Sequence, residues 1–180
     1  MTTQLIVYAE DAIAQARLTL GHDRLADLLV TTEPVRTTRA SVRALDGGRH
    51  VDLPELELDR SEILIAVPDG HRGDLGRRLG TVARPAVLRI GPYEVAGHLH
   101  GPASTNPFSL ARRRSWIAMT EATVRYRANG RVVTHARPTV LVNGGLPFAI
   151  EPTTDEDLEA RRPDQLAWST PKAGAFAVNF

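Results

Sequence analysis

Short runs of alternating hydrophobic and polar residues recur along the chain. Residues 87–97 fit an extended segment interrupted at Gly91-Pro92, and residues 123–127 alternate β-forming residues with polar ones. This period of two is typical of half-buried strands. The dipeptide Asn129-Gly130 tolerates the positive φ angles of a tight turn, so residues 122–127 and 131–135 are predicted to pair antiparallel. Asp46-Gly47-Gly48 predicts an equivalent turn nearer the N-terminus.

Signals for helices are few and short. Asn106 is a capping residue directly before Pro107, which suits a first helical position, and predicts one or two turns over residues 108–113. In the first part of the chain, Asp23 is the expected cap of a helix over residues 24–29. A third capped helix is predicted within residues 153–159, and the apolar tail at 173–180 is expected to pack on the folded domain or on a partner.

An internal repeat organises these elements. Three blocks of similar sequence recur in the same order at offsets of 81, 82 and 84 residues. The matched segments are 12–18 with 93–99, 39–44 with 121–126, and 56–60 with 140–144. Each copy contains a strand pair, a short helical insertion, a hairpin and a final strand, which predicts a small barrel of about five strands.

The repeat predicts a mainly β protein of two tandem five-stranded barrels with short helical insertions and an irregular C-terminal extension. The expected boundaries are residues 1–67 for the first barrel and 85–150 for the second. Residues 68–84 are rich in glycine and arginine and are predicted to be a linker, and residues 151–180 form the extension.

The second copy resembles the Sm-like (LSm/Hfq-type) family of small β-barrels. Gly97-His98-Leu99 is similar to the bend of that family's second strand, and residues 119–122 are similar to the Leu-x-Asp-Ala that begins the third. Residues 142–150 are similar to its closing turn and last strand. Both copies also resemble an uncharacterised bacterial Sm-like domain family, whose helical insertion is matched by residues 24–29.

The resemblance implies RNA binding and edge-to-edge association of units, with the fourth strand of one unit paired with the fifth strand of the next. The two barrels are expected to pair in this way within the chain, or to continue to a closed ring. Sm-like proteins hold RNA with an Asp-x-x-x-Asn loop after the second strand and with an Arg or Lys in the last turn. Here residues 100–107 replace that loop, and the last turn of the second copy holds Asn143 without a cation. The first copy has Arg60 at the corresponding turn. The resemblance therefore supports the prediction of the fold more strongly than the prediction of an RNA-binding site.

Charge is unevenly distributed along the chain. The formal net charge is +1, but residues 1–67 carry −4, residues 68–137 carry +8 and residues 138–180 carry −3. Arg112-Arg113-Arg114-Ser115-Trp116 combines three guanidinium groups with an aromatic ring, which suits phosphate contact and base stacking. In the alternative interpretation, the arginines cover the acidic first copy or a neighbouring subunit, and Trp116 lies in the core at the start of a strand.

No residue pattern indicates catalysis or a bound cofactor. The chain has no cysteine, the Gly-x-Ser-x-Gly elbow is missing, and the carboxylate pairs fit solvated faces. His98 and His100 share one strand face and would need a third metal ligand, such as His135 or Glu121. We expect them to be exposed residues flanking the core Leu99, with no metal site.

These observations predict a non-catalytic binding or assembly module. One hypothesis is single-stranded RNA binding through Arg60, Arg112–Arg114, Trp116 and Asn143. The alternative is a protein adaptor or structural subunit, homo-oligomeric or bound to another protein, that uses its barrel edges and the apolar tail without nucleic acid. The N-terminus lacks a basic region and a long apolar run, so we expect a cytoplasmic protein without membrane contact.

Overall fold

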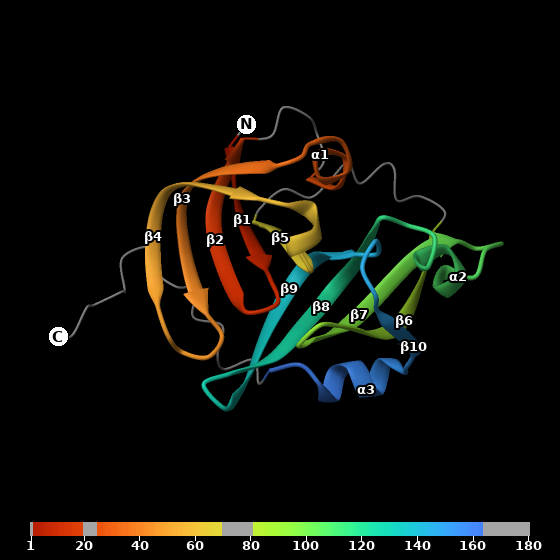
Figure 1. Cartoon of the computed structure of the whole chain (residues 1–180). Helices are drawn as coiled ribbons and strands as arrows, with labels where there is room; N and C mark the ends of the chain where they lie inside the picture. Colours follow the sequence, from red (N-terminus) through yellow and green to blue (C-terminus); the bar gives the residue numbers. More distant parts are fainter. Residues whose placement is uncertain (1, 20–24, 70–80, 164–180) are drawn as a thin grey trace.

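The computed structural model describes residues 2–19, 25–69 and 81–163, and its strands form one antiparallel sheet (Figure 1). The elements of the first half are β1 (Thr2–Tyr8), β2 (Ala12–Thr19), α1 (Leu25–Thr31), β3 (Val35–Ala44), β4 (His50–Leu58), the 3-10 helix η1 (Arg60–Glu62) and β5 (Ile65–Asp69). Those of the second half are β6 (Thr81–Ile90), β7 (Tyr93–Pro102), α2 (Pro107–Ala111), β8 (Trp116–Ala128), β9 (Arg131–Asn143), β10 (Ala149–Pro152) and α3 (Asp155–Ala160).

The mainly β prediction is confirmed, but the sheet is continuous and is not closed. Its strand order is β10-β6-β7-β8-β9-β5-β1-β2-β3-β4. Each half therefore has its fifth strand beside its first, followed by the second, third and fourth. The halves join because β5 pairs with β1 on one side and with β9 on the other.

Both halves bend at the same β-bulge. In the first half, two residues of β3, Arg39 and Ala40, lie opposite one residue of β2. In the second half, two residues of β8, Glu121 and Ala122, lie opposite one residue of β7. Arg39 has φ 51° and Glu121 has φ 48°, a left-handed conformation uncommon outside glycine. The repeat detected in the sequence thus corresponds to a repeated backbone distortion.

A proline faces each of these left-handed residues. In the register of β3 with β4, Arg39 lies opposite Pro54, and in that of β8 with β9, Glu121 lies opposite Pro138. Because proline has no N–H to donate, the ladder is interrupted at the same step in both halves. The two prolines are 84 residues apart, which extends the internal repeat.

The local capping and turn predictions are confirmed where the structure describes them. The Asn106 side chain accepts a hydrogen bond from the Phe108 N–H, and Pro107 is the first residue of α2. Thr154 caps α3 in the same way through Asp157 N–H, and Asn129-Gly130 connects β8 to β9. Asp23 and the tail at 173–180 lie outside the described residues.

The linker is shorter than the sequence predicted. β5 extends to Asp69 and β6 begins at Thr81, so the ends of the predicted 68–84 segment are strand. In the C-terminal extension, the predicted short helix is present as α3, which covers β6 and β7 through Leu158, a residue that packs on Val87 and Ala96.

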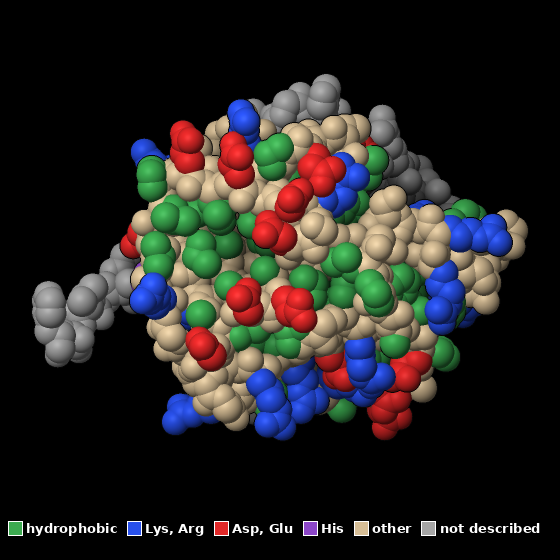
Figure 2. Space-filling model, in the orientation of Figure 1, with side chains coloured by type: hydrophobic (Ala, Val, Ile, Leu, Met, Phe, Trp, Pro, Cys, Tyr) green, Lys and Arg blue, Asp and Glu red, His purple; other side chains and the backbone are tan. Residues whose placement is uncertain are grey.

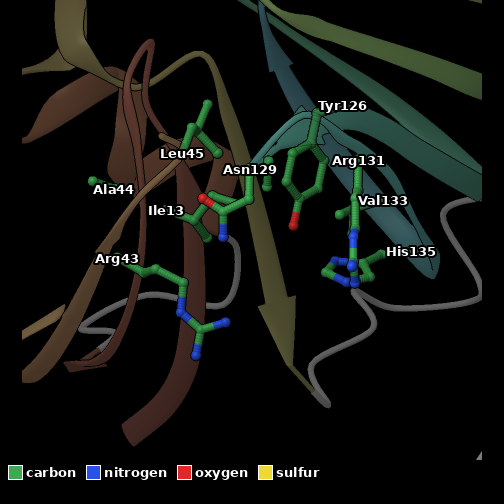
Figure 3. Close-up of a pocket in the computed structure, with 10 residues that line it drawn as sticks. Ile13, Arg43, Ala44, Leu45, Tyr126, Asn129, Arg131, Val133 and His135 are labelled. Carbon is green, nitrogen blue, oxygen red and sulfur yellow. The ribbon is translucent and has the colours of Figure 1, made fainter. Parts of the chain in front are cut away.

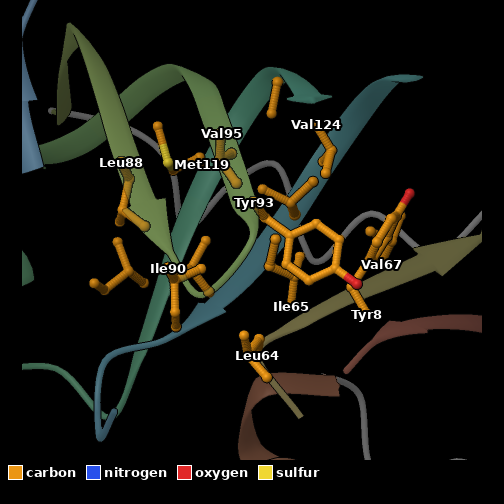
Figure 4. Close-up of a cluster of buried hydrophobic side chains, with 14 of the residues drawn as sticks. Tyr8, Leu64, Ile65, Val67, Leu88, Ile90, Tyr93, Val95, Met119 and Val124 are labelled. Carbon is orange, nitrogen blue, oxygen red and sulfur yellow. The ribbon is translucent and has the colours of Figure 1, made fainter. Parts of the chain in front are cut away.

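The largest hydrophobic cluster takes residues from both halves (Figure 4). Tyr8, Ile65 and Val67 of the first half pack with Tyr93, Val95 and other residues of the second. A second cluster fills the first half and includes Trp116 and Leu141 from the other. The halves therefore share apolar cores across the joint, and burial of this surface favours their association within the chain.

Candidate functional site

The predicted site residues meet at the joint between the halves. β5 and β9 pair through Ile65 with Val142 and Ala66 with Leu141. Asn143 follows directly, and its backbone N–H donates to the Leu64 carbonyl oxygen at 2.9 Å. The joint is therefore built from the turn that precedes β5 and the last residues of β9.

Asn143 is a structural clamp of this joint. Its side chain is 4% exposed, and Nδ2 donates to the carbonyl oxygens of Arg60 at 3.0 Å and Ile63 at 2.9 Å. Oδ1 accepts a hydrogen bond from the Gly145 N–H at 3.0 Å. These three bonds satisfy the buried amide, so it offers no group to an RNA ligand in this conformation.

Arg60 is also used within the chain. Its Nη2 donates to the Val30 carbonyl oxygen at 2.8 Å and lies 3.6 Å from Glu33 Oε2. Nε is buried, and no hydrogen-bond partner for it lies in the described parts of the chain. The guanidinium therefore ties η1 to the end of α1.

Trp116 lies in the core, as the alternative interpretation expected. It is the first residue of β8, opposite Asn143, and is 6% exposed. Its ring belongs to the cluster that fills the first half. A nucleobase could not stack on a ring buried in this way. Trp116 therefore packs in the core next to the joint and is not part of a binding surface.

The three arginines after α2 are the exposed part of the predicted site. Arg112, Arg113 and Arg114 are exposed, and within residues 2–19, 25–69 and 81–163 none of them has a carboxylate partner. The loop that contains these arginines is connected to the turn after β9, because the Gly144 N–H donates to the Ser115 carbonyl oxygen at 2.8 Å. A Cβ on Gly144 would overlap the Arg114 carbonyl oxygen, so this position requires glycine.

The charge asymmetry of the sequence is visible on the surface. Figure 2 shows Asp and Glu side chains gathered over the first half, with Lys and Arg more frequent along the lower and right-hand edges of the view. The exposed arginine loop thus belongs to the half with the positive excess, which favours attraction of anionic partners.

All three tyrosines of the chain form one cluster at the joint. The rings of Tyr8, Tyr93 and Tyr126 have centroid separations of 5.3, 5.6 and 6.0 Å, and the Tyr93 hydroxyl donates to the Ala9 carbonyl oxygen at 2.6 Å. Burial raises the pKa of each phenol, that of Tyr126 to about 12. Burial, then the charge of Arg137, lowers the pKa of His135, whose Nδ1 lies 3.4 Å from the Tyr8 hydroxyl.

The two histidines of β7 are engaged with different neighbours. His98 Nε2 lies 2.8 Å from Asp155 Oδ1, and Nδ1 lies 3.8 Å from Glu121 Oε2. His100 Nε2 lies 2.6 Å from Thr120 Oγ1. No group of three side chains suited to holding a metal occurs in the part of the chain that the structure describes.

Two strand edges end the sheet, β4 in the first half and β10 in the second. The sequence did not single them out by residue, although prolines and acidic residues in both segments are a signal of edge strands. Among the described residues, no helix is long and apolar enough to span a bilayer.

No protein-family model, curated protein or solved structure significantly matches the chain.

Proposed function

We propose that the protein is a non-catalytic assembly module made of two Sm-like units, in which chains join through the same strand pairing that joins the two halves. One observation carries the proposal: three of the four buried residues that pair at the internal joint have exposed or half-buried equivalents in the strands that end the sheet.

The two fifth strands illustrate the contrast. Ile65 and Ala66 of β5 are fully buried between β1 and β9, whereas their equivalents in β10, Ala149 and Ile150, are exposed and half-buried. The equivalence follows from the strand registers. Ile65 pairs with Tyr8, and Ala149 pairs with Arg89, which lies 81 residues after Tyr8 and is its equivalent in the second half.

The fourth strands differ in the same way. Leu141 and Val142 of β9 are buried against β5, whereas Glu57, the equivalent of Leu141 in β4, is exposed. Leu58, the equivalent of Val142, is buried within the core of its own half and does not show this contrast. Within residues 2–19, 25–69 and 81–163, each end of the sheet has a row of N–H and C=O groups without a strand partner, which can accept another strand. The two edges are equivalent to the strands that the internal joint brings together.

The internal joint also specifies the register of an external one. Transfer of the pairs Ile65–Val142 and Ala66–Leu141 places Ala149 opposite Leu58 of a second copy and Ile150 opposite Glu57 of that copy. Repetition of this contact is heterologous, so it would give a closed ring or an open filament according to its rotation.

Cysteine cross-linking tests this register, because the natural chain has no cysteine. The double variant Glu57→Cys, Ile150→Cys is expected to form intermolecular disulfides under mild oxidation. Residues opposite each other in an antiparallel pair have Cα atoms about 5.5 Å apart when hydrogen-bonded, which a disulfide can bridge. Non-reducing electrophoresis would show a ladder of dimers and larger species.

The matched control is Glu55→Cys, Ile150→Cys, in which the pair is displaced along the strand by about 7 Å. It should cross-link at least tenfold more slowly than the in-register pair. Equal rates in the two variants, or no cross-link in either, would reject the proposed contact.

The alternative predicted from the sequence is an adaptor that binds a different protein. The same two edge strands would form its binding surface. β4 contains Pro54 and acidic residues, and β10 contains Glu151 and Pro152, features that limit indiscriminate pairing of edge strands. The apolar tail assigned to this function lies outside the described residues. A chain that stays monomeric but binds a partner along β4 or β10 would favour this alternative.

A second candidate function is single-stranded RNA binding at the loop 112–114. The supporting observation is the presence of three exposed, adjacent guanidinium groups without carboxylate partners in the described segments, on a loop held rigidly against the turn at Gly144. Backbone phosphates are the ligands that such a group attracts, and the affinity would fall with salt as counterions are released.

Fluorescence anisotropy with a short single-stranded RNA tests this function. Binding at micromolar or lower concentration is expected at low salt, and replacement of Arg112, Arg113 and Arg114 by Ala should weaken it about tenfold or more while the protein stays folded. The control removes two exposed arginines elsewhere, Arg17→Ala and Arg84→Ala. No binding at low salt, or equal losses in both variants, would exclude the loop as an RNA site.

A further inference from the structure

A pocket of about 560 Å³ lies between the two halves, at the opposite ends of β8 and β9 from the arginine loop. The first half contributes Ile13 of β2 and the end of β3 with Arg43, and the second contributes the β8–β9 hairpin around Asn129. Figure 3 shows the residues of the first half on one side of the space and Tyr126, Arg131, Val133 and His135 on the other, with Asn129 between them. The volume is within the range of small-molecule sites.

A backbone contact fixes the two walls of this pocket. The Asn129 N–H donates to the Leu45 carbonyl oxygen at 3.0 Å, and Asn129 has φ 52°. The side chain of Asn129 lies against Gly47, whose φ of 80° and lack of a side chain allow this approach. Both hairpin turns are therefore held in place, so the pocket is formed before any ligand enters.

The pocket is positively charged. Arg43 and Arg131 line it from opposite halves, and none of the described residues that line it is acidic. Neither arginine forms an ion pair in the described parts of the chain, whereas Arg36, Arg89 and Arg162 elsewhere do. Two unpaired guanidinium groups facing one space create a site for an anionic group.

The remaining lining is apolar with a few polar groups. Ile13, Leu45 and Val133 supply aliphatic surface, and the Tyr126 hydroxyl points into the space between the walls in Figure 3. No hydrogen-bond partner for that hydroxyl lies among residues 2–19, 25–69 and 81–163. The ring of His135 is 5.7 Å from that of Tyr126 and meets it edge-on.

From this arrangement we infer that the pocket binds a small organic anion, with a carboxylate or phosphate between Arg43 and Arg131 and a flat apolar body against the aliphatic wall. The Tyr126 hydroxyl and the Asn129 amide would orient the body by hydrogen bonding. Since the ligand contacts both halves, its binding would stabilise the folded chain across the joint. The inference is independent of strand-edge assembly and of the arginine loop.

Titration calorimetry with the full chain tests the inference, with naphthoate and adenosine monophosphate as probes and inorganic phosphate as the reference. We expect at least one organic probe to bind with a dissociation constant below about 1 mM and at least tenfold more tightly than phosphate. Tighter binding of naphthoate would identify a carboxylate ligand, and tighter binding of the nucleotide a phosphate monoester.

The variants Arg43→Gln and Arg131→Gln should each lower the affinity for the organic probe about tenfold, since each removes a charge-assisted hydrogen bond. Arg17→Gln, an exposed arginine of β2 outside the pocket, is the matched control and should leave the affinity unchanged. Melting curves of the variants check that all of them are folded. Equal affinity in all variants, phosphate binding as tightly as both organic probes, or no organic probe bound at 1 mM would overturn the inference.

Discussion

Replacement of Asn143 by Leu is expected to lower the free energy of unfolding by about 3 kcal/mol or more. Leu has a similar volume but cannot hydrogen-bond, so the change leaves the carbonyl oxygens of Arg60 and Ile63 and the Gly145 N–H without their partner. Each buried polar group left unpaired costs about 1–3 kcal/mol, although water can reach those nearest the surface. Urea unfolding followed by circular dichroism measures the loss.

Asn106→Ala is the control for this prediction. Asn106 accepts one exposed hydrogen bond at the start of α2, so its loss should cost about 1 kcal/mol. Similar losses in the two variants would show that Asn143 does not clamp the joint. A larger loss at Asn143 is expected to accompany a weaker joint, because its three partners lie in the turns next to β5 and β9.

The second large effect is a loss of stability in alkali. All three phenols have a raised pKa in the folded chain, that of Tyr126 to about 12, against about 10 in an unfolded chain. The unfolded state therefore releases protons first. The stability from the neutral phenols is fully present below about pH 10 and falls progressively as the pH rises toward the folded-state values. Tyr126 alone contributes about 3 kcal/mol of this loss.

Tyrosinate absorbance and circular dichroism, recorded together during an alkaline titration, measure this effect. Because the chain has only these three tyrosines, the absorbance reports on the joint alone. We expect little ionisation at about pH 10 and then a common transition in both signals, whereas urea-unfolded protein should titrate near 10. Ionisation of a tyrosine near pH 10 with unchanged circular dichroism would contradict the buried cluster.

The sequence predicted the local elements well because their causes are local. Asn106 before Pro107 caps α2, Thr154 caps α3, and Asn129-Gly130 turns β8 into β9 through interactions between residues a few positions apart. The internal repeat predicted that the two halves have equivalent strands. Two closed barrels were also predicted, and the structure instead has one open sheet in which β5 is shared between β1 and β9.

The resemblance predicted that a fourth strand of one unit pairs with the fifth strand of the other, and β9 and β5 pair in this way. The side chains that fix the joint could not be predicted, since they connect residues about 80 positions apart. Asn143 and Arg60 were chosen as RNA-binding residues because they occupy the last turn of each copy, yet the fold brings these two turns together and uses Asn143 to connect them. Trp116 was chosen for its arginine neighbours, and its burial depends on packing against the other half. The tyrosine cluster and the pocket combine residues from both halves, so no local pattern marks them.

Sedimentation equilibrium of the full chain shows whether the edges β4 and β10 join copies of the chain as β9 and β5 join the two halves. We expect a mass of at least twice 19.6 kDa, which falls to 19.6 kDa when Ile150 is replaced by Pro, a residue that cannot donate to a neighbouring strand. A mass of 19.6 kDa for the natural chain at every concentration, with no partner bound, would contradict it.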